Sequence, residues 1–331
     1  MDRLSHIDNA RLVRPLPDLA ALANHEGVVS DESGLIERLN VSIAEDVLSP
    51  FADGERPSEF TFTPRQLAAF GKEKSFRGAF FGVLKMKSRD GVQVEEPVVV
   101  KQYPLGGQHD ASHNAAQELT MLAHAKAVGL STVDVVGAIV DRYSANPLVY
   151  VITRQKQGLE SMDELRWRGI TTAQMPDRLH PVVDTLVSMH TKLLFSGDPK
   201  FKNIGLGEDG SPIIFDLEHA TSLRDLVEHM TPENQDEVMD RLTKRMMSEF
   251  AHVASSLDSI IYPNLPQGER PRTPLERFNF EFTHVLELYH MRILESGSRY
   301  RDVLNQAYGR MLEKQHSNAL RLQAEYDSHP R

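Results

Sequence analysis

The chain has 331 residues, of which 40% are hydrophobic and 25% charged, and its formal net charge is -10. This composition is typical of a globular protein with enough apolar residues for a core, and the length suits two domains. The negative charge disfavours nucleic acids and anionic membranes as partners, because both are bound through basic surfaces. The absence of cysteine excludes disulfides, thiolate catalysis and zinc sites with cysteine ligands.

The chain begins without an apolar core of the signal-peptide type. No run in it reaches the roughly 18 apolar residues of a membrane span. We therefore expect a cytoplasmic protein that is not inserted in a membrane.

Residues 1–70 are predicted to form a helical N-terminal extension. Within them, residues 30–48 carry apolar side chains at roughly helical spacing. Thr63 and Pro64 suit the cap and first turn of a short helix at 63–70.

From residue 71 to 155 the pattern changes to strands, which we expect at 76–87, 97–103, 133–141 and 147–154. A helix is expected at 111–128, ending at Gly129. From 156 to 331 helices dominate: a long one at 176–195 has a single apolar stripe, and another covers 300–326. Two short apolar runs around the GEDG turn predict a hairpin over 202–219. The predicted fold class is α+β, with a small β-rich lobe at 71–155 and a larger helical lobe at 156–331.

Three polar residues lie next to the predicted hairpin. Asp198 and Asn203 stand five positions apart before it, and Asp216 follows its second apolar run. Phosphoryl transfer needs a carboxylate that orients the attacking hydroxyl and oxygen ligands that hold Mg²⁺ against the phosphates. The hairpin is expected to bring Asn203 and Asp216 together as metal ligands, while Asp198 faces the acceptor. Ordinary turn chemistry is the alternative, but it does not explain an apolar run that ends in a carboxylate.

Lys101 ends a β-branched strand, and Glu118 lies in the helix expected next. A lysine in this position can reach nucleotide phosphates if a carboxylate holds it, and Glu118 is the natural partner. Each residue alone would be interpreted as solvated. Together with Asp198, Asn203 and Asp216 they predict a site for ATP and Mg²⁺.

Taken in order over residues 71–225, this set resembles the protein-kinase-like superfamily, especially its branch of aminoglycoside phosphotransferases and related small-molecule kinases. The resemblance implies a bilobal fold and transfer of the γ-phosphoryl group of ATP to a hydroxyl. It makes Asp198 the catalytic aspartate and Lys200 a contact of the transferred phosphate, as in Ser/Thr protein kinases. Residues 153–158 match the hinge whose backbone binds adenine, which adds Arg154 and Lys156 to the expected nucleotide site.

The sequence departs from the family pattern at several points. Position 196 is serine, where histidine is usual, and Asp216 is followed by Leu217 and Glu218 instead of phenylalanine and glycine. The glycine-rich loop is degenerate, with Gly78 and Gly82 as its best candidates; a plain strand with a bulge is the alternative. Gly197 and the missing Ala-Pro-Glu signature favour the small-molecule branch.

Three functions follow as hypotheses. The first is a small-molecule kinase, and acidic residues of the late helices, such as Glu281 and Glu287, would suit a cationic acceptor. The second is a protein Ser/Thr kinase, indicated by Lys200. The third is a pseudokinase that binds nucleotide or a protein partner without catalysis, indicated by Ser196 and the degenerate glycine loop.

A competing motif is the pair His109 and His113, whose spacing on a helix would suit zinc, with Glu118 as a further ligand. The glutamate base of the zincin motif is replaced by Asp110. Solvated histidines at a helix start are the simpler interpretation.

Overall fold

The protein has a mixed α+β fold. The computed structural model describes residues 12–15, 27–30, 40–44, 57–67, 79–88, 90–104, 111–141, 148–156, 160–162 and 170–328. The chain divides into two compact units, Met1–Ala127 with Thr132–Gln157, and Val128–Ser131 with Gly158–Arg331. No helix in the described part of the chain combines the length and apolarity needed to cross a membrane.

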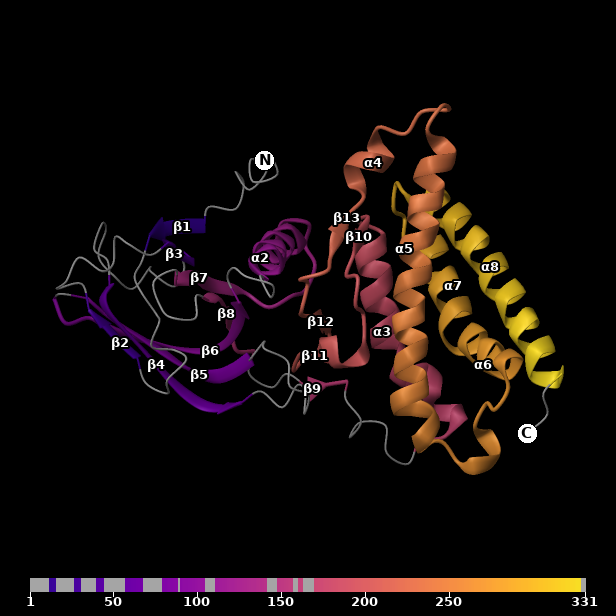
Figure 1. Cartoon of the computed structure of the whole chain (residues 1–331), viewed down its shortest axis with the longest axis horizontal. Coiled ribbons are helices and arrows are strands. Elements are labelled where there is room, and N and C mark those ends of the chain that lie inside the picture. Colours follow the sequence, from indigo (N-terminus) through magenta and orange to yellow (C-terminus); the bar gives the residue numbers. More distant parts are fainter. Residues whose placement is uncertain are drawn as a thin grey trace. The chain divides into compact units, whose positions relative to one another are not determined.

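In the part of the first unit that the structure describes, eight strands form one sheet in the order β1-β3-β7-β8-β6-β5-β4-β2, with antiparallel pairing throughout (Figure 1). The strands are β1 (Leu12–Pro15), β2 (Gly27–Ser30), β3 (Asn40–Ala44), β4 (Pro57–Leu67), β5 (Ala79–Ser88), β6 (Gln93–Pro104), β7 (Val135–Asp141) and β8 (Leu148–Arg154). Along the chain β4, β5 and β6 precede the helix α2 (Ser112–Ala127), and β7 and β8 follow it. The strands and helix predicted between residues 76 and 154 are therefore present.

The helix α2 packs on the sheet through small side chains. Ala111, Ala115 and Leu119 recur every four residues, as one face of a helix requires. They contact Tyr103 and Val149, which are buried on the strands. The short alanine side chains let the helix lie close to the sheet, which brings residues of α2 within reach of residues of β6.

The predicted helical N-terminal extension is wrong. Instead of helices, the described parts of residues 1–70 are the strands β1 to β4, and all four belong to the eight-stranded sheet. In β3, Val41 and Ile43 alternate with polar residues, and in β4 Phe60 and Phe62 alternate with threonine and glutamate. This period of two favours a strand, and hydrogen bonds to distant neighbours in the sheet outweigh a weak helical spacing.

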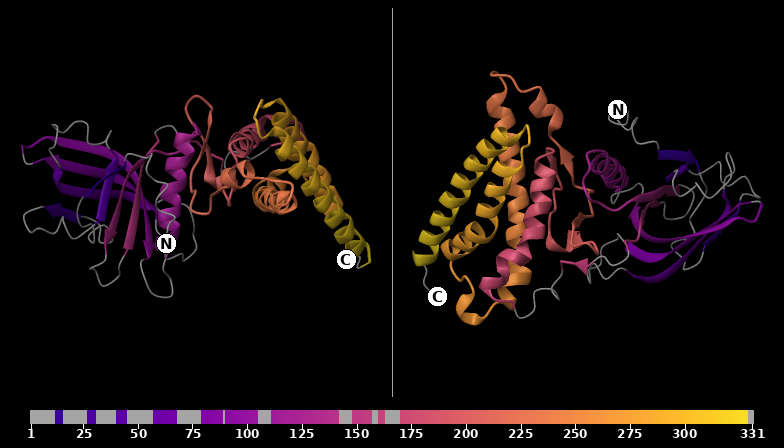
Figure 2. Two further views of the ribbon diagram at one scale, coloured as in Figure 1. Left: turned by 90° about the horizontal axis from the view of Figure 1, so that it is seen from above. Right: turned by 180° about the vertical axis from the view of Figure 1, so that it is seen from behind.

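The second unit is mainly helical, and its helices lie together as a bundle in each view (Figure 1, Figure 2). Its main helices are α3 (Met175–His190), α4 (Arg224–Glu228), α5 (Gln235–Ser256), α6 (Pro274–Glu281), α7 (Glu287–Glu295) and α8 (Arg301–Ser328). Two π-helical segments, Leu257–Ile261 and Phe282–Leu286, follow α5 and α6. Single 3-10 turns are η7 (Thr172–Gln174), η8 (Phe201–Asn203), η10 (Tyr262–Asn264) and η11 (Gln267–Glu269). The core includes the predicted apolar stripe of α3, whose members Leu179, Val182, Val183, Leu186 and Met189 are buried.

Short strands lie beside the bundle. The hairpin predicted from the GEDG turn is present, with β11 (Ile204–Leu206) antiparallel to β12 (Pro212–Ile214) and β9 (Glu160–Ser161) pairing with β11. A second small sheet pairs β10 (Leu194–Phe195) with β13 (Thr221–Ser222). These two pairings fix both ends of the loop at 196–203, which carries the predicted catalytic residues.

Candidate active site

Lys101 and Glu118 form the ion pair that the sequence predicts. Lys101 lies on β6, and its Nζ is 2.6 Å from Oε1 of Glu118 on α2. Glu118 is only 1% exposed. A buried carboxylate is costly unless charged and hydrogen-bonding groups compensate it, and here Lys101 and the hydroxyl of Tyr103, which donates to Oε2, do so.

Tyr103 is a member of this cluster that the sequence interpretation missed. It follows Lys101 by two residues on β6, and side chains at that spacing lie on one face of a strand. The alternation of side chains along a strand therefore predicts that Tyr103 and Lys101 lie on the same face. With Tyr103 and Glu118 both buried, the ammonium group of Lys101, whose side chain is 23% exposed, is held at a defined position.

The two hinge residues predicted to contact the nucleotide are engaged inside the first unit. Nε of Arg154 is 2.7 Å from Oε1 of Glu96. The backbone N–H of Arg154 donates to the backbone carbonyl of Asp134. Nζ of Lys156 is 3.5 Å from Oδ2 of Asp134. Burial acts to raise the pKa of Asp134, but Lys126 and Lys156 together hold it below its usual value. The side chains of Arg154 and Lys156 thus pair with carboxylates on neighbouring segments of the first unit, on β6 and just before β7.

Of the two glycines predicted for a glycine-rich loop, the structure describes Gly82. Gly82 is buried within β5 and pairs with Val98 on one side and Pro64 on the other, next to a register shift in β4. It therefore matches the alternative interpretation of a strand with a bulge, and its backbone is occupied by the sheet. Gly78 lies outside the described residues.

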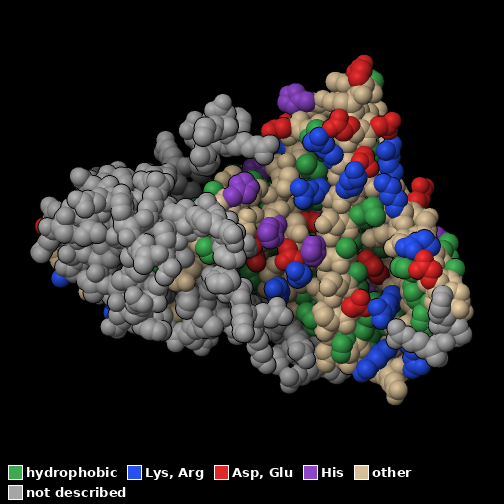
Figure 3. Space-filling view, viewed as in Figure 1, with side chains coloured by type: hydrophobic (Ala, Val, Ile, Leu, Met, Phe, Trp, Pro, Cys, Tyr) green, Lys and Arg blue, Asp and Glu red, His purple; other side chains and the backbone are tan. Residues whose placement is uncertain are grey.

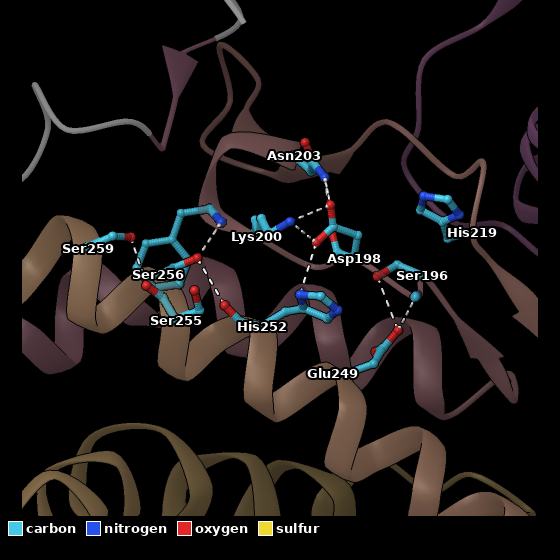
Figure 4. A network of polar contacts seen from close by, with 12 residues as sticks. Ser196, Asp198, Lys200, Asn203, His219, Glu249, His252, Ser255, Ser256 and Ser259 are labelled. Atoms are coloured by element: carbon cyan, nitrogen blue, oxygen red, sulfur yellow. Dashed lines mark hydrogen bonds and ion pairs between the residues drawn. The ribbon is translucent and has the colours of Figure 1, made fainter. Parts of the chain in front are cut away.

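In the second unit, Asp198, Lys200 and Asn203 converge on one short loop (Figure 4). Nζ of Lys200 lies 2.9 Å from Oδ1 and 3.0 Å from Oδ2 of Asp198. Nδ2 of Asn203 donates to the carbonyl oxygen of Asp198 at 2.9 Å and lies 3.4 Å from its Oδ2. The carboxylate of Asp198 is thus held by a cation and an amide from its own loop.

The hairpin brings the backbone of Asn203 next to Phe215, the residue before Asp216. Ile204 pairs with Ile214, and the Phe215 N–H donates to the carbonyl of Asn203 at 3.1 Å. Asp216 adopts a φ of 67°, a left-handed conformation that is rare outside glycine and concentrates at functional sites.

These two residues have the chemistry of a Mg²⁺ site. Mg²⁺ is bound by oxygen ligands, which Asn203 and Asp216 both carry. Because Nδ2 of Asn203 is directed at Asp198, its Oδ1 faces the other way and is the atom that would bind a cation. The described residues contain no group of three or more histidine and acidic side chains arranged for a metal. Of the zinc candidates, His109 lies outside the described residues.

A buried polar network fixes the start of the loop at 196–203. Glu249 on α5 is fully buried and accepts hydrogen bonds from Oγ of Ser196 at 3.1 Å and from the Gly197 N–H at 2.7 Å. Its second oxygen lies 2.7 Å from Nε2 of His190, whose Nδ1 lies 2.7 Å from the hydroxyl of Tyr289. Ser196 therefore has a defined structural role in place of the histidine that the family resemblance implies.

Gly197 has two local reasons to be glycine. Its φ is 78°, and a Cβ atom at this position would lie 2.3 Å from the carbonyl oxygen of His219. The close approach of the backbones lets the loop pass beside Glu218 and His219. The side chain of Glu218 is only 11% exposed, and its Oε1 lies 3.2 Å from Nε2 of His219.

Glu249 and His252 are site residues that the sequence interpretation did not find. Nδ1 of His252 on α5 lies 3.1 Å from Oδ1 of Asp198 (Figure 4). Both residues lie about fifty positions after the loop, and no spacing in the sequence connects them to it. Only the packing of α5 against the loop reveals the contact.

Of the acidic residues suggested for a cationic acceptor, Glu281 lies in surroundings that disfavour its charged form. Burial, with a contribution from the charge of Asp258, raises the pKa of Glu281 to about 8, so this side chain is mostly protonated at neutral pH. On the face of the second unit in Figure 3, basic and acidic side chains are interspersed. This surface differs from the clustered basic patch that nucleic-acid binding requires.

Two comparisons with known proteins give no relative. No protein-family model matches the chain, and no curated protein matches it significantly. The assignment of a function therefore depends on the geometry described above.

Proposed function

We propose that the protein is an ATP- and Mg²⁺-dependent phosphotransferase of the protein-kinase-like type, which transfers the γ-phosphoryl group to a hydroxyl of a small molecule. The observation that carries the proposal is the cluster on the loop at 196–203. There a carboxylate is held by a lysine and an asparagine, and the hairpin joins the backbone of the asparagine to the residue before a second aspartate. The Lys101–Glu118 pair and the order of strands around α2 support it.

In this proposal each residue has one task. Asp198 orients the acceptor hydroxyl and accepts its proton, and Lys200 offsets negative charge on the moving phosphoryl group. Lys101, held by Glu118, contacts nucleotide phosphates. Mg²⁺, when bound, neutralises charge on the phosphate oxygens. Asn203 and Asp216 would hold the metal through their side-chain oxygens.

A small acceptor is favoured by the short connection after Asp216. In the described chain, only residues 217–220 separate Asp216 from β13, and β13 is paired with β10. A kinase that acts on proteins uses a long, phosphorylation-controlled segment here, which orders the site for its substrate. The sequence after β13 also lacks the Ala-Pro-Glu signature that ends such a segment, and α4 begins at Arg224.

Nucleotide binding tests the proposal through thermal stability with ATP and Mg²⁺. The wild type is expected to be stabilised by about 2–3 kcal/mol at ATP concentrations near a hundred times Kd. Asp216→Asn and Lys101→Met should lose most of this shift. Asp209→Asn is the matched control, because Asp209 is an exposed carboxylate at the turn of the same hairpin, where its Oδ1 accepts hydrogen bonds from Ser211. An equal shift in all four proteins would contradict the proposal.

Turnover tests the chemistry separately from binding. Asp198→Asn should reduce phosphate release from γ-labelled ATP by roughly 10²–10⁴-fold, because it removes the proton acceptor, while the thermal shift remains. Screening hydroxyl-bearing small molecules and proteins with the same label identifies the acceptor class. Binding of ATP without turnover in the wild type would favour the pseudokinase hypothesis instead.

A further inference from the structure

Three side chains of the helix α5 contact the loop at 196–203, which carries the proposed catalytic residues. Glu249 accepts hydrogen bonds at the start of the loop, and Oγ of Ser256 lies 3.3 Å from the N–H of Phe201 near its end. His252 lies between them on the same face of α5, since residues three and four apart on a helix are neighbours. Its Nδ1 lies 3.1 Å from Oδ1 of Asp198 (Figure 4). The middle contact is therefore made to the carboxylate itself.

This contact differs in kind from those of Lys200 and Asn203. Both of these residues belong to the same loop as Asp198, so they move with it and set only its internal geometry. His252 belongs to α5, whose inner face is buried in the core through Met246, Phe250 and Val253. A contact from this helix fixes the carboxylate relative to the core of the second unit.

The approach of His252 also defines which ring atom faces the carboxylate. Nδ1 lies within ion-pair distance of Oδ1 of Asp198, and a proton on this nitrogen makes the contact attractive. Rotation of the carboxylate about its Cβ–Cγ bond is then opposed from α5 on one side and by Lys200 on the other. Orientation of this kind matters for phosphoryl transfer, because a displacement of about 1 Å at the reacting groups can reduce the rate by two orders of magnitude.

We infer that His252 is a positioning residue for Asp198, which holds the carboxylate in the orientation that receives the acceptor proton. The inference rests on the proposed function. A purely stabilising role is disfavoured, because the side chain of His252 is 32% exposed and ion pairs with this degree of exposure contribute little to folding. Removing the ring should therefore change the rate and leave the melting temperature nearly unchanged.

Kinetics of ATP hydrolysis with Mg²⁺, with water as the acceptor, test the inference. His252→Leu is expected to lower kcat roughly tenfold or more and to leave KM for ATP within about twofold, since the ring acts on Asp198 and not on the nucleotide. His252→Asn, whose Nδ2–H replaces the donor, should regain most of kcat. Ser259→Ala is the matched control on α5, because Ser259 bonds to a carbonyl of its own helix.

A second measurement requires no turnover. The ring-nitrogen resonances of His252 in NMR spectra should shift when Asp198 is replaced by Asn, and stay unchanged in Ser259→Ala. No shift on Asp198→Asn would overturn the inference, and so would a His252→Leu variant with the kcat of the wild type. A wild type that hydrolyses no ATP and phosphorylates no acceptor would instead overturn the proposed function, and the catalytic role of His252 with it.

Discussion

At the scale of single residues, Gly197 illustrates how the conformation of the loop at 196–203 depends on a backbone that only glycine adopts easily. We expect Gly197→Ala to lower the free energy of unfolding by about 3 kcal/mol or more, because the added Cβ meets the carbonyl oxygen of His219 at a position with a φ of 78°. Urea denaturation measures the loss.

Gly210 provides the matched control for this substitution. Its φ is 76°, but a Cβ there has nothing within 4 Å. Gly210→Ala should therefore cost only about 1 kcal/mol, from backbone strain alone. Equal losses in the two variants would show that the close approach to His219 does not matter.

Glu281 makes the stability of the second unit depend on pH. Its Oε1 is enclosed without a hydrogen-bond partner among the described residues, and burial raises its pKa from 4.5 to about 8. Because the folded-state pKa is the higher one, the protonated group favours folding. This stability is fully present below about pH 4.5 and is lost as pH rises through about 8.

Replacing Glu281 by glutamine should remove this dependence. At pH 8 the Glu281→Gln variant is expected to be more stable than the wild type by on the order of 3 kcal/mol, and at pH 4.5 the two should be nearly equal. Thermal unfolding across this range measures the difference. Glu287→Gln, an exposed position on α7, is the control and should follow the wild type. A constant difference between Glu281→Gln and the wild type would refute the assignment.

At the scale of elements, α5 stabilises the loop at 196–203 through the buried carboxylate of Glu249. Glu249→Ala would leave Nε2 of His190, the Ser196 hydroxyl and the Gly197 N–H without their acceptor. Loss of one partner from such a buried network typically costs about 3–5 kcal/mol. We expect the free energy of unfolding, measured by urea denaturation, to fall by that amount.

The control for Glu249 is on the same helix. Glu237 is exposed and pairs with Arg241 one turn away, so Glu237→Ala should cost less than about 0.5 kcal/mol. Similar losses from the two substitutions would mean that the buried network contributes no more than an exposed pair.

At the scale of the whole molecule, each unit has a buried core of its own. The sheet and α2 pack around Tyr103, Val149 and Val151, and the helical unit around residues such as Leu186, Phe250 and Tyr289. Units with separate cores can lose stability separately. Glu249→Ala is therefore expected to speed amide hydrogen exchange in α3 and α5 and leave β5, β6 and β8 unchanged. Equal acceleration in both units would show that they unfold as one.

Local patterns in the sequence determined a large part of this structure. The apolar stripe of α3, the hairpin β11–β12 and the strands around α2 follow from periodicities of 3.6 and 2 and from turn residues. The pairing of Lys101 with Glu118 also followed, because it joins a strand to the next helix. These features depend on residues close together in the chain, so short-range patterns are sufficient to predict them.

The tertiary structure alone decided the rest. The strands β1 to β4 form because distant neighbours in the sheet supply their hydrogen bonds, and a weak local helical pattern does not survive that competition. The contacts of Glu249 and His252 with the loop at 196–203 join segments more than fifty residues apart. Whether a polar side chain is buried against a charge or left in water depends on such packing, and no local pattern encodes it.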